Sequence, residues 1–383
     1  MSKNEDWKYT QLDEAGFRDY ALVEAPPTAS RAAVDWSQFY DQFYGHLIPP
    51  ESLVWVFENG ALVAQSETTV SGVQLQASES TDLVAGSKTP NWLLACSEAA
   101  LAQQGGKWVW QVTESIDAPL IVLHFYTGTK PKQASFTRHA FTVAPSAKIS
   151  LVEIVGDLHP ANLSGLCYGQ TSLALGEGAA VQHQRLSLAT AGMTVLSDVD
   201  VRLSSQAHYD LHTAVSGGKQ HRANLTVALA GNAAKAAVNC LHWASQQEQI
   251  DTALDVQHLA DDGESAVVIR GVADNRGTSS VTGTIHIPPT VRRNAAQLEN
   301  KNILLSTEAT INSRPQLVIE HDDIQQCSHG ATIGCLSPED LFYLQSRGLP
   351  LKEAKQLLLN SFIEPILSGF VPAVGEAIRA QLL

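Results

Sequence analysis

The 383-residue chain lacks the motifs by which several large enzyme classes are recognised. It contains no G-x-x-x-x-G-K-[ST] loop for nucleotide phosphates, no G-x-S-x-G and no H-E-x-x-H. The segment Gly217-Gly218-Lys219 lacks the preceding spacing and the following hydroxyl of a phosphate loop, so it indicates a turn. We therefore expect no nucleotide hydrolysis by the chain itself.

Positive charge is also scarce. The chain has 25 Lys and Arg against 39 Asp and Glu, which gives a net charge of -14. Nucleic acids and anionic membranes attract proteins through Lys and Arg. The sequence thus predicts binding to neither.

Long apolar runs are absent, and the N-terminus does not show the basic start and apolar stretch of a secretory signal. We expect a soluble protein of the cytoplasm. The five cysteines are an odd number, widely spaced and without a C-x-x-C pair. They predict neither a disulfide framework nor a complete zinc or iron–sulfur cage.

The first part of the chain, residues 1–110, is predicted to be an α+β region. Trp36, Phe39, Tyr40 and Phe43 recur at helical spacing, which predicts an amphipathic helix. Asn59-Gly60 separates two apolar runs, which predicts a β-hairpin.

Residues 111–336 contain short runs rich in Val, Leu, Ile and Thr, in which a loose repeat of an aliphatic residue, a small residue, two variable residues and Ala recurs. Its copies end at Ala147, Ala179, Ala207, Ala233 and Ala309, in steps of 32, 28, 26 and 76 residues. We interpret the last step as about three repeats. This pattern favours a β-solenoid with small residues at its corners, although a sandwich or barrel would also give many short strands.

Residues 337–383 are predicted to form a helical unit. Ser337 is a preferred N-cap before Pro338, and Gly348 has the place of the residue that follows a helix. A second helix is expected to present Ala354, Leu357, Leu358, Ser361 and Phe362 on one side, with Pro365 as a kink. This unit is expected either to cover the open end of the solenoid or to dock a partner.

The segment around Cys327 and His329 carries the most interesting chemistry. In a strand the two side chains point to the same face, so a thiolate and an imidazole could share a metal or sulfur species. Two ligands do not complete a site, so the others must come from elsewhere, such as another subunit. The alternative is an ordinary buried thiol beside a hydrogen-bonded imidazole.

Two further groups have structural explanations. His208, Asp210 and His212 alternate along a predicted strand, which favours a solvated strand edge over a metal site. The acidic segment Asp261-Asp262-Gly263-Glu264 lacks the ligand spacing of a calcium loop and predicts a surface corner.

The C-terminal sequence carries a specific resemblance. It lies in Arg314-Pro315-Gln316-Leu317-Val318-Ile319, Asp322-Asp323, Cys327-Ser328-His329-Gly330-Ala331-Thr332-Ile333-Gly334, Leu341-Phe342-Tyr343-Leu344 and Ser346-Arg347-Gly348. These segments resemble the SufD branch of the SufB/SufD family of SUF iron–sulfur cluster assembly proteins. His321 and Cys335 depart from the family pattern.

The resemblance implies a fold and a role. The fold is mainly β, a right-handed parallel β-helix flanked by N-terminal α/β and C-terminal helical regions. The implied role is that of a non-catalytic scaffold, which assembles with SufB and with the ATPase SufC and supports cluster assembly by acquiring or handling iron.

The resemblance also implies site residues. His329, with Cys327 in support, would lie near the SufB interface, where an iron–sulfur cluster or iron binds transiently and nothing is held tightly by the chain alone. The SufC-docking residues would lie in the C-terminal helical region, at Leu341, Phe342, Tyr343, Arg347 and Gly348. A homodimer through the solenoid is a further expectation when SufB is absent.

Two alternatives remain from other classes of protein. A β-helical carbohydrate-active enzyme or polysaccharide-binding protein would favour exposed aromatics, yet only 7% of this chain is aromatic. A stand-alone metalloenzyme using Cys327 and His329 predicts tight metal in the single purified chain.

Overall fold

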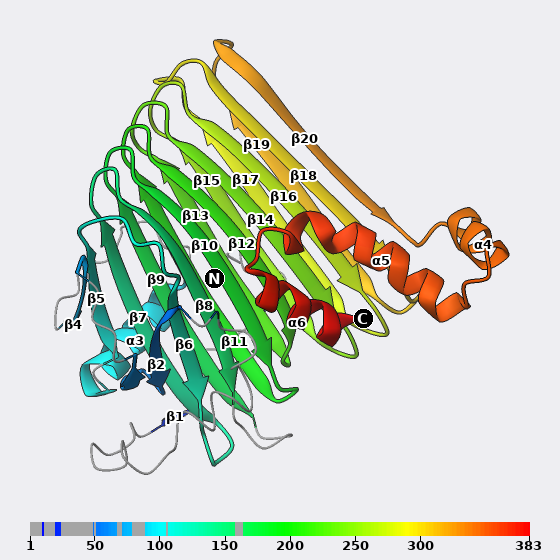
Figure 1. The fold of residues 1–383 in the computed structure, drawn as a ribbon, viewed down its shortest axis with the longest axis horizontal. Coiled ribbons are helices and arrows are strands. Elements are labelled where there is room, and N and C mark those ends of the chain that lie inside the picture. Colours follow the sequence, from blue (N-terminus) through cyan, green and yellow to red (C-terminus); the bar gives the residue numbers. More distant parts are fainter. Residues whose placement is uncertain are drawn as a thin grey trace.

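Two parallel β-sheets wound as a solenoid form the body of the protein (Figure 1). The computed structural model describes residues 10, 20–23, 49, 51–66, 71–78, 89–104, 106–157 and 164–383. The helix expected around residues 36–43 lies outside these residues. Within them, one sheet has the order β19-β17-β15-β13-β11-β9-β7-β5-β4 with β1 beside β7, and the other β20-β18-β16-β14-β12-β10-β8-β6-β2-β3.

The described elements have the following bounds. They are β1 Ala21–Leu22, β2 Leu53–Glu58, β3 Ala61–Gln65, β4 Val73–Ala77, α3 Asn91–Gln104, β5 Lys107–Val112, β6 Leu120–Tyr126, β7 Gln133–Val143, β8 Lys148–Asp157, β9 Gly165–Leu175, β10 Ala180–Ala189, β11 Met193–Leu203, β12 His208–Gly217, β13 Gln220–Leu229, β14 Lys235–Ala244, β15 Gln249–His258, β16 Glu264–Ala273, β17 Thr278–Ile287, β18 Asn294–Leu304, β19 Thr310–Ile319, β20 Ile324–Gly334, α4 Pro338–Ser346, α5 Leu351–Leu367 and α6 Pro372–Leu382.

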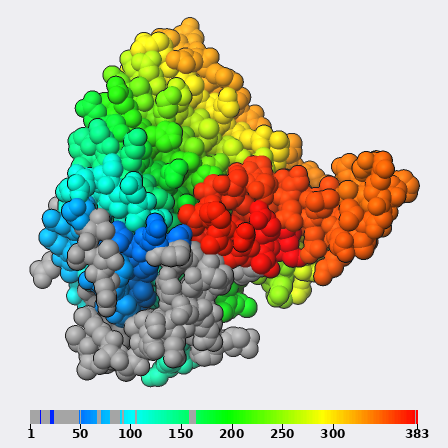
Figure 2. All heavy atoms as spheres, in the orientation of Figure 1, coloured from blue at the N-terminus to red at the C-terminus, as the bar shows by residue number. Residues whose placement is uncertain are grey.

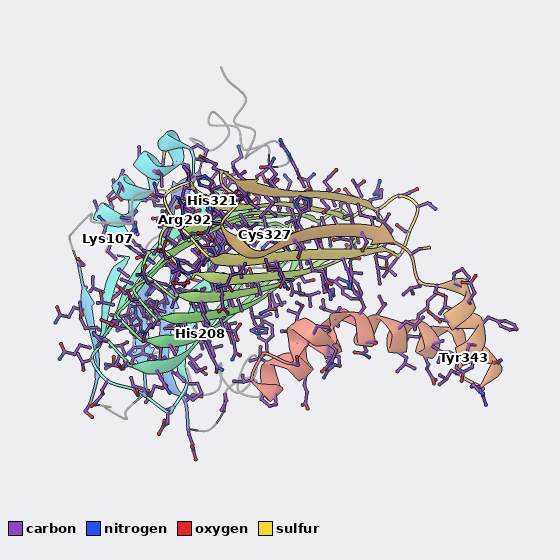
Figure 3. The ribbon with its side chains drawn as sticks, turned by 90° about the horizontal axis from the view of Figure 1, so that it is seen from above. Lys107, His208, Arg292, His321, Cys327 and Tyr343 are labelled. Atoms are coloured by element: carbon purple, nitrogen blue, oxygen red, sulfur yellow. The ribbon has the colours of Figure 1, made fainter. Side chains whose placement is uncertain are left out.

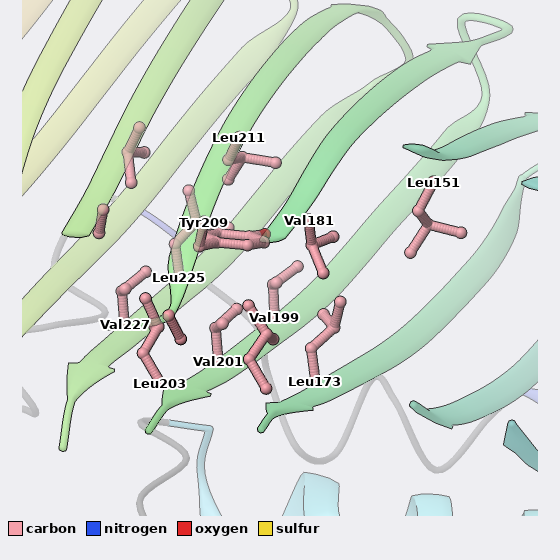
Figure 4. Packing of buried hydrophobic residues seen from close by; sticks show 14 of the residues in the cluster. Leu151, Leu173, Val181, Val199, Val201, Leu203, Tyr209, Leu211, Leu225 and Val227 are labelled. Carbon is pink, nitrogen blue, oxygen red and sulfur yellow. The ribbon is translucent and has the colours of Figure 1, made fainter. Parts of the chain in front are cut away.

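Each coil contributes one strand to each sheet and stacks in register on the next coil. All pairings among strands β5 to β20 are parallel. This confirms the predicted solenoid over the sandwich or barrel. Alternate side chains point inward, where Leu173, Leu203, Leu211 and other apolar residues stack into a continuous core (Figure 4). Burying this apolar face is what holds neighbouring coils together.

One corner of the coil explains the sequence repeat. A residue with positive φ occurs there in each coil, and the backbone N–H of each such residue donates to a carbonyl of the next coil, at Ser146, Gly178, Gln206, Ala233, Asp262 and Arg293. The steps between these residues are 32, 28, 27, 29 and 31, so a coil is about 29 residues long. A buried Ala follows at 147, 179, 207 and 234. The fourth copy of the repeat was therefore placed one residue early at Ala233.

The copy of the sequence repeat that ends at Ala309 was assigned to the wrong corner of the coil. It lies between β18 and β19, whereas the other four copies precede even-numbered strands. The 76-residue step consequently spans about two and a half coils, not three short repeats. Both corners use small residues where backbones approach closely, so composition alone did not distinguish them.

The C-terminal helices lie against the outer face of the second sheet. Ile363, Ile366 and Val374 pack with outward residues of that sheet, including Ile154 and Leu241. The unit therefore leaves the end of the solenoid uncovered (Figure 1). The predicted face of α5 is partly wrong, because Leu357 and Ser361 are exposed while Leu359 and Ile363 are buried.

The described N-terminal strands extend the solenoid. The Asn59-Gly60 hairpin is confirmed, with β2 and β3 antiparallel and β2 parallel to β6. Helix α3 covers the other sheet, where Leu93 and Leu101 pack against Phe136 and Tyr168.

Candidate functional site

The C-terminal end of the solenoid is an open edge formed by β19 and β20. Each is the last strand of its sheet and pairs on one side only, with β17 and β18. Among the described residues, no further coil and no helix covers this end (Figure 1). Edge strands of this kind present unpaired backbone groups on which another chain can build.

Cys327 and His329 occupy inward-facing positions of β20. Cys327 pairs in register with Ala296 and His329 with Leu298, both of which belong to the buried core. Successive inward positions lie two residues apart, so the two side chains share one face, as predicted. Because the coil is the last one, this inner face opens at the end of the solenoid.

The opposite wall of the opening comes from β19. Ser313, Pro315 and Leu317 pair in register with Val281, Gly283 and Ile285, two of which are core residues. Ser313 accepts a hydrogen bond of 2.7 Å from the amide of Asn300. The opening is therefore lined by apolar residues with a few hydrogen-bonding groups, beside one thiol and one imidazole.

Cys327 and His329 differ in exposure. Cys327 is half-buried and packs against the core, whereas His329 is exposed. Burial raises the pKa of the Cys327 thiol above its usual 9.0, although a hydrogen bond with the Ala296 backbone acts in the opposite direction. The thiol is thus protonated near neutral pH, which does not favour a spontaneously reactive nucleophile.

The donor set at the opening is incomplete. Among the described residues, no group of three or more His, Cys, Asp or Glu side chains is placed to hold a metal ion. One thiol and one imidazole can contribute two ligands, while iron–sulfur clusters and tetrahedral sites take three or four. Further ligands would have to come from outside the described residues, such as another chain.

A second exposed feature is the arm formed by α4 and the start of α5. Ser337 caps α4 by accepting a hydrogen bond from the Asp340 N–H, and Gly348 follows with φ +95°, as the sequence predicted. No residue of α4 is buried. Phe342 and Tyr343 are 74% and 56% exposed, and Arg347 stacks on the Tyr343 ring at 5.2 Å.

The arm extends away from the solenoid body. Figure 2 shows α4 projecting from the molecule, and Figure 3 places Tyr343 at the far end of the arm, away from Cys327. The structure therefore separates the two groups of residues singled out from the sequence. Any partners that used them would bind at different places.

The remaining candidates have structural partners. His208, Asp210 and His212 alternate along β12 as predicted, but the expected solvated strand edge is wrong. Strand β12 pairs with both β10 and β14, and His212 lies beneath α5, where it contacts the carbonyl of Ile366. Arg293 pairs with Asp262 at 2.7 Å, so the acidic segment is a surface corner. The N–H of Asp323 donates to His321 Nδ1 at 3.1 Å, which stabilises the turn before β20.

A buried charged cluster inside the solenoid was missed by sequence reasoning. Glu153 accepts hydrogen bonds from Thr171 and His183 and pairs with Arg185 at 2.8 Å. The sequence signal was the alternation of polar His183, Arg185 and Ser187 along a strand, which ordinarily indicates a solvated face. Here that face points inward.

Comparisons with known proteins identify the family of the chain. Residues 125–362 match the model of the family described as SUF system FeS cluster assembly, SufBD core domain. The chain is 25% identical over 268 residues to the iron–sulfur cluster assembly protein SufD of Escherichia coli, covering 69% of this chain and 62% of that protein. It is 29% identical over 197 residues to a SufBD family protein of Synechocystis, covering 51% and 43%.

A plant protein is also similar. The chloroplastic protein ABCI7 of Arabidopsis thaliana is 28% identical over 196 residues, covering 51% of this chain and 41% of that protein. The chain thus matches less than two thirds of the length of each of these relatives. In the described part of the chain, no helix combines the length and apolar character needed to cross a membrane. Because the family model spans more than half of the sequence, this chain belongs to the SufBD family of SUF-system iron–sulfur cluster assembly proteins.

Proposed function

We propose that the chain is a non-catalytic scaffold subunit of a cytoplasmic SUF complex, in which it assembles with a SufB-type subunit and the ATPase SufC. Iron or a nascent cluster is cargo of this complex, not a group held by the chain alone. The observation that carries the proposal is the open end of the solenoid, where edge strands β19 and β20 lie beside an incomplete ligand pair. Family membership argues against the carbohydrate-active alternative.

The open end supports the placement of the SufB-type partner. Val318 and Ile333 are large apolar residues that are 42% and 47% exposed on the two edge strands. A second β-solenoid could continue the sheets and cover them. The same end would serve a homodimer when the SufB-type partner is absent.

At this interface His329 is proposed as an iron ligand or iron-handling residue. Its exposure lets it contact a group held between two chains. Cys327 lies two positions earlier on the same face and supports it. The missing ligands then come from the partner, which explains why one chain would hold little metal.

The exposed arm is the proposed docking site for the ATPase. The proposed docking residues lie in or directly after α4, which has no fully buried residue in the single chain. They are Leu341, Phe342, Tyr343, Arg347 and Gly348. Exposed aromatics and Arg are the residues that most often dominate protein–protein binding.

The test is anaerobic co-purification of the tagged chain with the SufB and SufC of the same source, measuring subunit stoichiometry, iron and sulfide. We expect both partners to be recovered, and His329→Ala to reduce bound iron without loss of partners. The matched control is His286→Ala, because His286 is 37% exposed on the outer face and pairs with Glu320. Normal iron in the His329 variant would remove the proposed role, and failure to recover partners would remove the scaffold assignment.

A further inference from the structure

Three small residues stack in register inside the solenoid. Gly169 of β9 pairs with Ser197 of β11, which pairs with Ala223 of β13, and all three occupy inward-facing positions. Inward residues of the same strands, such as Leu173 and Leu225, are fully buried. Gly169, Ser197 and Ala223 are nevertheless only half-buried. Empty space must therefore lie in front of them.

That space is a partly enclosed cavity of about 40 Å³. Its lining includes hydroxyls and buried titratable groups, among them Thr171, Arg185, Thr213 and His242. A cavity with apolar walls stays dry, whereas one with several hydrogen-bonding partners holds water. Allowing about 10–15 Å³ for each water, this volume accommodates at least two.

Arg185 supplies hydrogen-bond donors to the cavity. Its Nε lies 2.8 Å from a carboxylate oxygen of Glu153, yet it is buried without an aligned hydrogen-bond acceptor among the described residues. The side chain is only 11% exposed and lines the cavity. A buried guanidinium with unused N–H groups is costly unless a guest accepts them.

A second unsatisfied group lines the same cavity. His124 is 7% exposed, and its Nδ1 is buried without a hydrogen-bond partner among the described residues. It approaches the carboxylate of Glu153 at 3.8 Å through its other nitrogen. A guest that both donates and accepts hydrogen bonds would satisfy it together with Arg185.

The charges around the cavity favour a neutral guest. Glu153 balances Arg185, and burial lowers the pKa values of His221 and His242 to about 4, so both imidazoles are neutral near pH 7. An anion would add an uncompensated buried charge. Water carries no such cost and can both donate and accept.

We propose that this cavity is an internal water site, in which at least two ordered water molecules accept hydrogen bonds from Arg185 and satisfy His124. The waters connect the Glu153–Arg185 pair to the hydroxyls of neighbouring coils. The small residues Gly169, Ser197 and Ala223 provide the room for them.

The test is an atomic-resolution crystal structure of the full chain, with a second crystal soaked in bromide. We expect discrete density within about 2.7–3.2 Å of the Arg185 guanidinium nitrogens, with no anomalous bromide signal. Gly169→Ala should remove at least one of these peaks, because its new methyl group faces the cavity. That methyl fits, since its nearest neighbour, Thr137 Oγ1, would be 3.4 Å away.

The matched control is Ala174→Val, on the exposed outer face of the same strand, which should leave the peaks unchanged. A cavity without density in the unmodified chain would overturn the proposal. So would a bromide peak on Arg185, because it would identify an anion site.

Discussion

His212 joins the C-terminal helices to the solenoid through a polar contact, as does Gln184, which accepts a hydrogen bond from the N–H of Val371. Its Nδ1 lies 2.9 Å from the carbonyl of Ile366, near the end of α5, and its Nε2 lies 3.3 Å from Asp210. A Cβ on Gly369 would lie 1.8 Å from the imidazole ring, so the approach requires glycine. Burial alone would lower the pKa of His212, but the hydrogen bonds and the charge of Asp210 outweigh it and raise the pKa above 6.5.

This contact predicts pH-dependent stability. A histidine whose folded pKa is raised stabilises the fold fully below its unfolded pKa, and the contribution is lost as pH rises through the folded value. The unfolding free energy of the unmodified chain should therefore exceed that of His212→Gln by about 1–2 kcal/mol at pH 6, and by less at pH 8. Urea titrations at both pH values measure it. A difference in unfolding free energy that grew with pH would contradict the stabilising role of protonated His212.

Glu153 predicts the opposite pH dependence, because the stability that it contributes is lost as pH falls. Burial would raise its pKa, but Arg185, the nearby imidazole of His124 and the hydrogen bond with His183 hold the pKa well below 4.5. Glu153→Gln should lower the free energy of unfolding by about 3–5 kcal/mol near neutral pH, because it leaves Arg185 charged and unpaired inside the solenoid. The cost should shrink as pH falls below 4.5 toward the folded pKa.

Urea titration of Glu153→Gln beside a matched variant measures this loss of unfolding free energy. The control is Glu264→Gln, because Glu264 pairs with Lys235 in an exposed ion pair and should cost less than about 1 kcal/mol. Equal losses in the two variants would show that Glu153 is not the buried counterion of Arg185.

Among the elements, the two edge strands are unequal. Pro315 lies within β19 and has no backbone N–H, so it removes one donor from that strand. Strand β20 contains no proline and carries both Cys327 and His329. We therefore expect a partner to pair one of its own strands with β20.

The arm predicts a separation between binding and stability. The double variant Phe342→Ala/Tyr343→Ala should change the unfolding free energy by no more than about 0.5 kcal/mol, because neither ring is buried. It should weaken binding of the ATPase about 30-fold or more, as loss of an aromatic hot spot does. Isothermal titration and urea unfolding measure the two effects.

A substitution at a buried position of α5 contrasts with the exposed arm in its effect on stability. Leu359→Ala on α5 removes a buried side chain, so it should cost about 2–5 kcal/mol. If the double variant on α4 bound the ATPase normally, the arm would not be its docking site.

Local signals predicted the elements, whereas the inside of the solenoid required the three-dimensional register. Ser337, Gly348 and Asn59-Gly60 act through neighbouring residues, so their cap, helix end and hairpin could be identified from sequence. The lining of the cavity is set by residues about 29 positions apart, which local patterns do not connect. The same limit explains the misplaced corners at Ala233 and Ala309.

At the scale of the whole molecule, the candidate site was predicted only in part. The strand period correctly placed Cys327 and His329 on one face. It could not show that this face opens at the end of the solenoid, because that depends on where the helices pack. Apolar residues of α5 and α6 cover the outer face of a sheet and leave both edge strands free.

Hydrogen exchange read by mass spectrometry tests the central claim most directly, by comparing the chain alone with the chain bound to a SufB-type partner. We expect the partner to slow exchange in Thr310–Ile319 and Ile324–Gly334, most strongly in the latter. Strand Gly165–Leu175, which is already paired on both sides, should not change. Protection elsewhere, with both edge strands unaffected, would contradict the account of the open end as the assembly site.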